Sequence, residues 1–214
     1  MSKRFSPLNI ELTVITSAML SAVLVSAALL PKAAYAGDFT DPLYVGVSAG
    51  VKSNFKFSNI GSAPRDDDAK TTGKIYAGYV FNTSNVGRQP VSHAVELSAY
   101  TGKTGDIPFK RGNAVAPGSG EMLGIGLAYA AAYEVAPQIS MTGRVGVGYT
   151  RSEITYVTGP TQKTNDSSVI FGLGAAYHVN DKLSLHADWD RLPVKFDTQK
   201  DKLNMFSIGA RYKF

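Results

Sequence analysis

The sequence contains no cysteine, which excludes disulfide cross-links, a thiol nucleophile, a cysteine-ligated metal centre and a lipid anchor on cysteine. Only three histidines are present, which disfavours a multi-histidine metal site. Charged residues make up 18% of the chain, below the ~25% that is average for soluble proteins. From these absences we expect no cofactor, no bound metal and no catalytic residues.

The positive charge of the chain is small and dispersed. The formal net charge is +5, of which residues 1–36 contribute +2 through Lys3, Arg4 and Lys32 against Glu11. The other +3 is spread over residues 37–214, without a run of Lys and Arg. Nucleic-acid binding proteins usually concentrate positive charge in a patch or stripe, so nucleic acid is not an expected partner.

One long apolar run is present, and it lies at the N-terminus. It extends from Leu12 to Leu30, after the basic residues Lys3 and Arg4 and before the sequence Ala34-Tyr35-Ala36. An uncleaved membrane helix is the alternative, but a small-residue site with Ala34 and Ala36 is typical of signal-peptide cleavage. The sequence therefore predicts a secretory signal peptide at 1–36, cleaved after Ala36, and a mature domain at 37–214.

Beyond the predicted signal peptide, apolar and polar residues alternate with a period of two. In one segment Met141, Val145 and Val147 fall on one face, and Thr142 and Arg144 fall on the other. Alternation over about ten residues is typical of a strand with one face in lipid and one in a lumen. Eight segments show this pattern: Leu43–Lys52, Gly73–Asn82, Val91–Thr101, Glu121–Glu134, Ile139–Thr150, Ser168–Val179, Leu183–Leu192 and Leu203–Phe214.

A soluble β-sandwich would also alternate, but two features favour a membrane barrel. The polar face is rich in glycine within the segments, which is unusual for the outer face of a sandwich. The connections also alternate between short and long, the long polar ones being 53–72, 102–120, 151–167 and 193–202. The pattern predicts an all-β fold, an eight-stranded antiparallel transmembrane up-and-down β-barrel with short periplasmic turns and long extracellular loops.

The C-terminal segment carries a more specific signal. Phe206, Ile208, Ala210, Tyr212 and Phe214 place an apolar residue at every second position up to a terminal phenylalanine. This ending resembles the signal that the barrel-assembly machinery reads in Gram-negative outer-membrane proteins, carried here by Ile208, Tyr212 and Phe214. Residues 43–214 thus resemble the small eight-stranded barrel families, the OmpA-like and opacity/NspA-like surface proteins. The resemblance implies the cell outer membrane as location, and its lipids and the assembly machinery as partners.

Three charged residues are predicted to meet inside the barrel. Glu96, Arg144 and Asp188 each lie five residues after the start of an upward-running segment, on the polar face. Similar heights would place them together, and an unpaired charge there would be costly, so we expect a Glu96–Arg144–Asp188 cluster that plugs the lumen. Four further inward side chains are expected to complete its polar layers: Tyr44, Tyr76, Tyr100 and His186.

The long connections contain many cations, including Lys110, Arg111, Lys200 and Lys202. Contact with the phosphates of lipopolysaccharide is the first interpretation. Adhesion to a host-surface ligand, such as a sulfated polymer, is the second, because recognition often lies on loops. Asp66, Asp67 and Asp68 lack the spacing of a calcium-binding loop and are interpreted as a solvated loop tip.

An enzyme acting on lipid A would need a lipid-facing serine beside a histidine. His93 falls on the apolar face near the periplasmic end, and the sequence suggests no lipid-facing serine beside it. The preferred hypothesis is a structural or surface-interaction protein, a scaffold that displays loops and can act as an adhesin. A narrow porin or channel is the alternative, and a lipid A-modifying enzyme is the least favoured.

Overall fold

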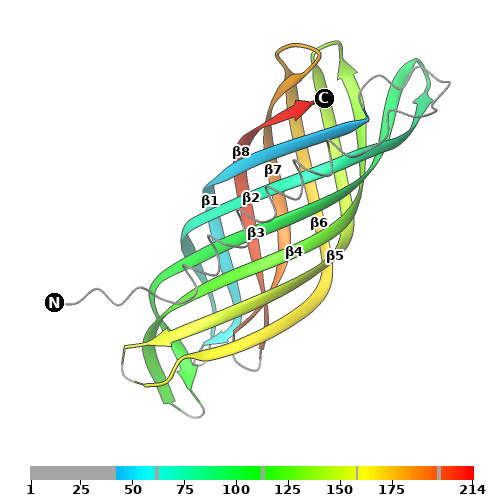
Figure 1. Ribbon diagram of the computed structural model, residues 1–214. Coiled ribbons are helices and arrows are strands. Elements are labelled where there is room, and N and C mark those ends of the chain that lie inside the picture. The colour runs from blue at the N-terminus through cyan, green and yellow to red at the C-terminus, as the bar shows by residue number, and fades with distance from the viewer. Residues whose placement is uncertain (1–41, 61–62, 112–113, 158, 197–198) are drawn as a thin grey trace.

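The computed structural model shows eight antiparallel strands that form one closed barrel in sequence order (Figure 1). It describes residues 42–60, 63–111, 114–157, 159–196 and 199–214, with side chains except at 56–68, 70, 105–116 and 196–201. No helix in this part of the chain is long and apolar enough to span a bilayer. The strands are β1 (Leu43–Ile60), β2 (Ala63–Val86), β3 (Gln89–Arg111), β4 (Ala114–Ala136), β5 (Ile139–Tyr156), β6 (Gln162–His178), β7 (Leu183–Phe196) and β8 (Gln199–Lys213).

The barrel closes where its first and last strands meet. β1 pairs with β8 from Tyr44↔Lys213 to Lys56↔Lys202, and the amide of Phe214 donates to the carbonyl of Leu43 at 3.1 Å. Because the strand number is even, β1 begins and β8 ends at the same end of the barrel (Figure 1). A closed antiparallel ladder pairs the edge strands, as a barrel in lipid requires. The predicted eight-stranded antiparallel fold is confirmed.

The strands are longer than the sequence analysis predicted. The four connections expected to be long loops are largely strand: β3 and β4, for example, pair from Val91↔Tyr133 to Arg111↔Ala114. A polar segment can continue an antiparallel ladder outside the membrane, since each added residue pair satisfies backbone donors and acceptors. Periodicity alone found only the apolar, membrane-level part of each strand. At the opposite end β2 and β3 are joined by a tight turn, in which Gly87 has a φ of +66°.

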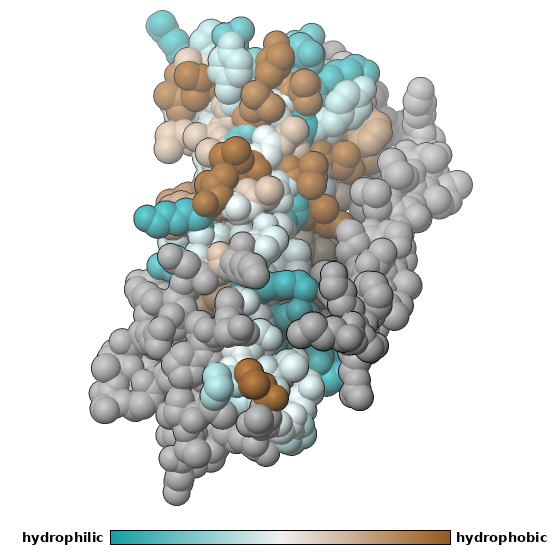
Figure 2. Space-filling view, turned by 90° about the vertical axis from the view of Figure 1, so that its left-hand side faces the viewer, coloured by the Kyte–Doolittle hydropathy of each residue, from teal (hydrophilic) through white to brown (hydrophobic). Residues whose placement is uncertain are grey.

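The outer wall is apolar and the interior is tightly packed. Val147, Leu173 and Ile208 are all more than half exposed, although they lie in the middle of strands. Figure 2 shows hydrophobic side chains over the upper half of one face, with hydrophilic ones at the upper rim. Such an exposed apolar belt is expected of a barrel surrounded by lipid.

Glycines on the inward face make room for tyrosine rings in the lumen. Tyr44 pairs with Gly78 and Tyr76 with Gly46 across the β1–β2 seam, so each ring lies over the opposite glycine. A Cβ at either glycine would overlap the tyrosine ring. The two rings meet edge to face, with centroids 6.1 Å apart. The small residues on the polar face therefore serve packing inside a narrow barrel.

Candidate functional site

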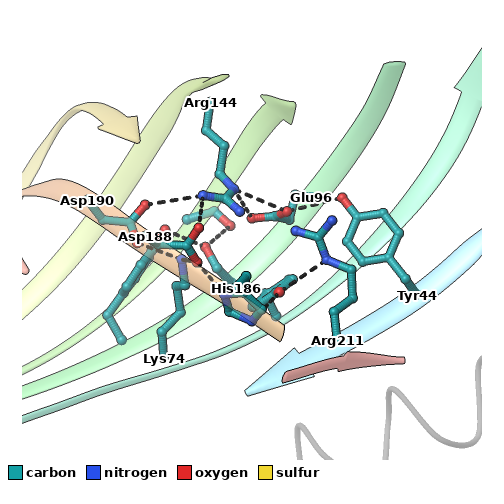
Figure 3. Close-up of polar contacts among 12 residues, drawn as sticks. Tyr44, Lys74, Glu96, Arg144, His186, Asp188, Asp190 and Arg211 are labelled. Atoms are coloured by element: carbon teal, nitrogen blue, oxygen red, sulfur yellow. Dashed lines mark hydrogen bonds and ion pairs between the residues drawn. The ribbon is translucent and has the colours of Figure 1, made fainter. Parts of the chain in front are cut away.

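The structure brings the three predicted lumen charges together. Arg144 Nε lies 3.1 Å from Glu96 Oε1, and Arg144 Nη1 lies 3.0 Å from Asp188 Oδ1 (Figure 3). All three side chains are almost completely buried. They come from β3, β5 and β7, which are not neighbours, so the contacts span the inside of the barrel.

Two further charges, which the sequence analysis did not include, complete this cluster. Lys74 Nζ lies 3.2 Å from Asp188 Oδ2 and 2.5 Å from Asp190 Oδ2. Asp190 follows Asp188 by two residues, and Lys74 precedes Tyr76 by two, so both belong to the inward face. The alternation would have placed them in the lumen, but it does not reveal that Lys74 reaches across from β2 to β7. We call Lys74, Glu96, Arg144, Asp188 and Asp190 the lumen cluster.

A layer of aromatic and basic side chains adjoins the lumen cluster on the side of the short turns. Tyr44 donates its hydroxyl proton to Glu96 at 3.1 Å, and Arg211 Nε donates to Tyr76 OH at 3.2 Å. Tyr76 OH also lies 2.9 Å from His186 Nε2. Arg211 stacks over the ring of Tyr44, with Cζ 4.7 Å from its centroid. The structure thus places predicted residues Tyr44, Tyr76 and His186 in one network and adds Arg211 to it.

The fourth predicted aromatic residue, Tyr100, belongs to a different environment. Its hydroxyl accepts a hydrogen bond from Ser98 at 2.8 Å, and its ring joins a buried apolar group. This group fills the lumen between the lumen cluster and the long hairpins. Its largest members, each at most 2% exposed, are Phe55, Met122, Ile154, Leu192, Leu203 and Met205.

The sequence analysis assigned most of this half of the chain to long polar loops, whereas the structure has extended strands there with an apolar core inside them. The physical reason is that the extended strands continue the barrel beyond the membrane level. Apolar side chains buried inside that part stabilise it, as in a soluble protein. Together the lumen cluster and the apolar core fill the middle of the lumen and its hairpin half with side chains, and a pocket of about 80 Å³ remains at the short-turn end. This arrangement suits a closed barrel better than an open water path.

The lumen cluster has more negative than positive groups, yet every carboxylate has a cation within reach. Lys74 pairs with Asp188 and Asp190, and Arg144 pairs with Glu96 and Asp188. Burying such charges is costly unless they are paired and hydrogen-bonded, and removing one partner leaves an uncompensated charge. The cluster is thus suited to holding the four strands β2, β3, β5 and β7 in one arrangement.

The residues of the predicted assembly signal lie on the outer wall of β8 and just beyond it. Ile208 and Tyr212 are exposed, and Phe214 contacts Tyr212 edge to face with ring centroids 5.3 Å apart. They form a continuous apolar strip at the seam with β1. An assembly role for this strip stays a prediction.

Several predicted residues fall outside the described part of the structure. Ala34 and Ala36 precede the described residues, and so does the rest of the predicted signal peptide. The side chains of Lys110, Arg111 and Lys200 are likewise not among those described, nor are those of Asp66, Asp67 and Asp68. Lys202 is described and is exposed on β8. A surface role for these cations stays a prediction.

The expectation that no serine lies beside His93 is wrong. Ser84 Oγ lies 2.7 Å from His93 Nε2, and Tyr129 OH lies 2.5 Å from His93 Nδ1. An irregularity in the β2–β3 pairing between Val80 and Asn82 shifts the side-chain alternation of β2 and turns Ser84 to the outer wall. Because the third group is a tyrosine hydroxyl rather than a carboxylate, the histidine lacks the anion that stabilises an imidazolium in hydrolases.

The other polar clusters in the described part of the chain suggest no metal centre. Within that part, no three His, Asp or Glu side chains are grouped so that they could hold a metal ion. His178 contacts two hydroxyl groups, with Nδ1 3.1 Å from Ser184 Oγ and Nε2 3.0 Å from Ser140 Oγ.

Comparisons with known proteins agree with this architecture. The family model described as the outer membrane protein beta-barrel domain matches residues 20–214. Among solved structures, Ail, the attachment invasion locus protein of Yersinia pestis, is similar with a TM-score of 0.54 and 15% identity, covering 82% of this chain and 100% of Ail. Neisserial surface protein A (NspA) gives a TM-score of 0.52 and 17% identity, covering 81% of this chain and 97% of NspA.

A second Ail structure, in complex with the heparin analogue sucrose octasulfate, gives a TM-score of 0.50 and 14% identity, covering 82% of this chain and 100% of that chain. At such identities the similarity extends to the fold alone. No curated protein sequence matches the chain.

Proposed function

Because the chain belongs to the outer membrane protein β-barrel domain family, we propose that it is a closed, non-catalytic scaffold with a structural and surface-interaction role. The observation that carries the proposal is the filled lumen. The lumen cluster ties β2, β3, β5 and β7 together at mid-height, and buried Phe55, Met122 and Leu203 occupy the lumen beyond it. A rigid barrel of this kind can present its four long hairpins at the cell surface.

The surface role of the hairpins is proposed from their charge. Cations such as Lys202 are suited to contact with the phosphates of outer-leaflet lipid, including lipopolysaccharide. Adhesion to a sulfated host polymer would use the same chemistry, and it is noteworthy that Ail was solved with a heparin analogue. Cells that display the protein should lose heparin binding on replacement of Lys110 and Arg111 by glutamine if adhesion depends on them. Unchanged binding would limit these cations to the lipid role.

The closed lumen is tested by electrical recording. The mature chain, refolded and inserted into a planar bilayer, should give no large steady conductance, because charged and apolar side chains fill the path. Heat-modifiable gel migration of the same sample would verify that the barrel is folded. A large steady conductance from folded protein would overturn the scaffold proposal in favour of a narrow channel.

Export is the remaining part of the proposal. We propose that residues 1–36 form a signal peptide and that the barrel inserts with the help of the assembly machinery. The apolar run from Leu12 to Leu30, the site at Ala34 and Ala36 and the terminal Phe214 support this. The described barrel begins at Leu43, which leaves a short segment between the proposed cleavage site and β1.

A further inference from the structure

One seam of the barrel wall is paired over only part of its length. β6 and β7 pair from His178↔Ser184 to Phe171↔Arg191, where their described pairing stops. Beyond that point β6 continues to Gln162 against β5, and β7 continues to Phe196 against β8. The wall therefore opens between β6 and β7 on the side of the long hairpins.

The chain itself explains why the pairing stops. Pro193 has no backbone N–H, so β7 cannot donate to β6 at this position. The carbonyl of Pro193 instead accepts a hydrogen bond of 2.9 Å from the hydroxyl of Thr150, a buried residue of β5. Leu192 and Val194 on either side are buried in the apolar core. The end of β7 thus leans into the barrel and away from the edge of β6.

The opening holds a cleft of about 230 Å³ with a cationic side and an apolar side. Arg191 and Lys202 supply two positive charges, and Ser168 supplies a hydroxyl group. Val169 and Phe171, each about half exposed on the outer wall of β6, line the apolar side. Asp166 also lines the cleft, so these three charged groups together carry one net positive charge.

Arg191 has an unused donor in this cleft. Its Nε is buried and has no hydrogen-bond partner among the described residues. Buried donors are normally satisfied, whereas this donor holds no internal acceptor among those residues that a ligand would have to displace. A phosphate suits the position, because a guanidinium can donate two parallel hydrogen bonds to it and a nearby lysine adds charge.

The cleft lies at the height of lipid head groups. On the outer face of β7, Leu185 and Trp189 precede Arg191 by six and two residues, and Trp189 pairs with Phe206 of β8. Tryptophan and phenylalanine at the end of an apolar strip are typical of the membrane interface, and the next outward residue is expected among the head groups. An acyl chain that runs from this height toward the membrane midplane would lie against Phe171, because Val169 is on the hairpin side of it.

We propose that the cleft between β6 and β7 binds a phosphate group of an outer-leaflet lipid, held by Arg191 and Lys202, with an acyl chain against Phe171. The inference deepens the proposed contact with outer-membrane lipid and rests on that part of the proposed function. It assigns the contact to a single seam of the wall and to two named cations.

The test uses the full mature barrel in detergent, with lipid A as the probe and native mass spectrometry as the measurement. Arg191→Gln should weaken lipid A binding about tenfold, since it removes a charged bidentate donor. Lys52→Gln is the matched control, because Lys52 is an exposed cation beside Phe206 and does not line the cleft. It should change binding less than twofold. Asp166→Asn should strengthen binding, since it removes the negative charge of the cleft.

Two further probes identify the source of the phosphate. Dephosphorylated lipid A should bind wild type and Arg191→Gln equally, and inorganic phosphate alone should bind far more weakly than lipid A. Equal binding of lipid A to wild type and Arg191→Gln would overturn the proposal, and inorganic phosphate that binds as tightly as lipid A would overturn its lipid part. Lys202→Gln serves as the second variant if Arg191→Gln does not show the heat-modifiable migration of a folded barrel. The lipid A measurements test the cleft, and the conductance recording tests the closed scaffold. Failure of one proposal can therefore be told apart from failure of the other.

Discussion

Arg144 and Asp188 lie 44 residues apart in the chain and join β5 to β7 through a hydrogen bond of 3.0 Å between Arg144 Nη1 and Asp188 Oδ1. The strand between them, β6, contributes Gly172 and Gly174 to the inward face beside them. A Cβ at Gly174 would overlap the carboxylate of Asp188. The ion pair therefore depends on a neighbouring strand that has no side chain at this point.

Removing Arg144 should strongly destabilise the barrel. Arg144→Met leaves Glu96 without its cation and Asp188 with Lys74 and the imidazole of His186, so the free energy of unfolding should fall by about 3–5 kcal/mol. Urea unfolding in lipid vesicles, followed by the fluorescence of Trp189, measures this. Lys182→Met is the control, because Lys182 is exposed in the turn between β6 and β7; this substitution should change the free energy of unfolding by no more than about 0.5 kcal/mol. Equal effects of the two substitutions would contradict the proposed role of the lumen cluster.

A charged substitution can test which face of β5 is in contact with lipid. Val145 is exposed on the apolar face of β5, and Val145→Arg should cost ~2–4 kcal/mol if it lies near the membrane midplane. Val157→Arg is the control, since Val157 is exposed just beyond the end of β5 at Tyr156 and should tolerate arginine. The same urea unfolding measures both variants. A neutral Val145→Arg would mean that this face is not in contact with lipid.

The glycine–tyrosine packing predicts a position-dependent response to one added methyl group. Gly78→Ala places a Cβ in the ring of Tyr44 and should cost about 1–3 kcal/mol through overpacking. Gly143→Ala places a Cβ in open space on the outer face of β5 and should be neutral or slightly stabilising. If the two variants unfold at the same urea concentration, the close contact between Tyr44 and Gly78 contributes nothing to stability.

The terminal aromatic residue is expected to act during assembly. Phe214→Ala should reduce the amount of folded barrel in outer-membrane fractions, seen as less heat-modifiable protein on gels. Phe214→Tyr keeps the aromatic ring and the edge contact with Tyr212, so it should assemble normally. Comparable yields of the alanine variant and the wild type would show that the assembly signal lies elsewhere.

The proposed signal peptide predicts the N-terminus of the mature protein. Mass spectrometry of the chain purified from outer membranes should give a first residue of Gly37. Replacing Ala36 by a bulky residue such as leucine should retain the N-terminal segment, because signal peptidase requires small residues at this site. A purified protein that still begins at Met1 would favour the uncleaved membrane helix.

Regular features of the sequence predicted the fold and part of the site. Alternation located all eight strands, because residues in a pleated strand point to opposite faces and lipid and lumen select different side chains. Equal spacing from the strand starts placed Glu96, Arg144 and Asp188 at one height, where the structure has them in contact. Lys74 and Arg211 also lie on inward positions, but their long side chains reach residues of other strands, and spacing carries no information on that reach.

By itself the sequence determined the strand number, the inward and outward faces and the apolar belt, because each depends on a local period of two. Only the tertiary structure decided which polar partners meet. An irregularity in pairing near Asn82 brought Ser84 to His93, and Pro193 with the inward lean of β7 left the β6–β7 seam open beyond Phe171 and Arg191. Such features arise from the closure of the whole barrel, where one shifted residue pair or one missing N–H changes contacts between segments far apart in the chain.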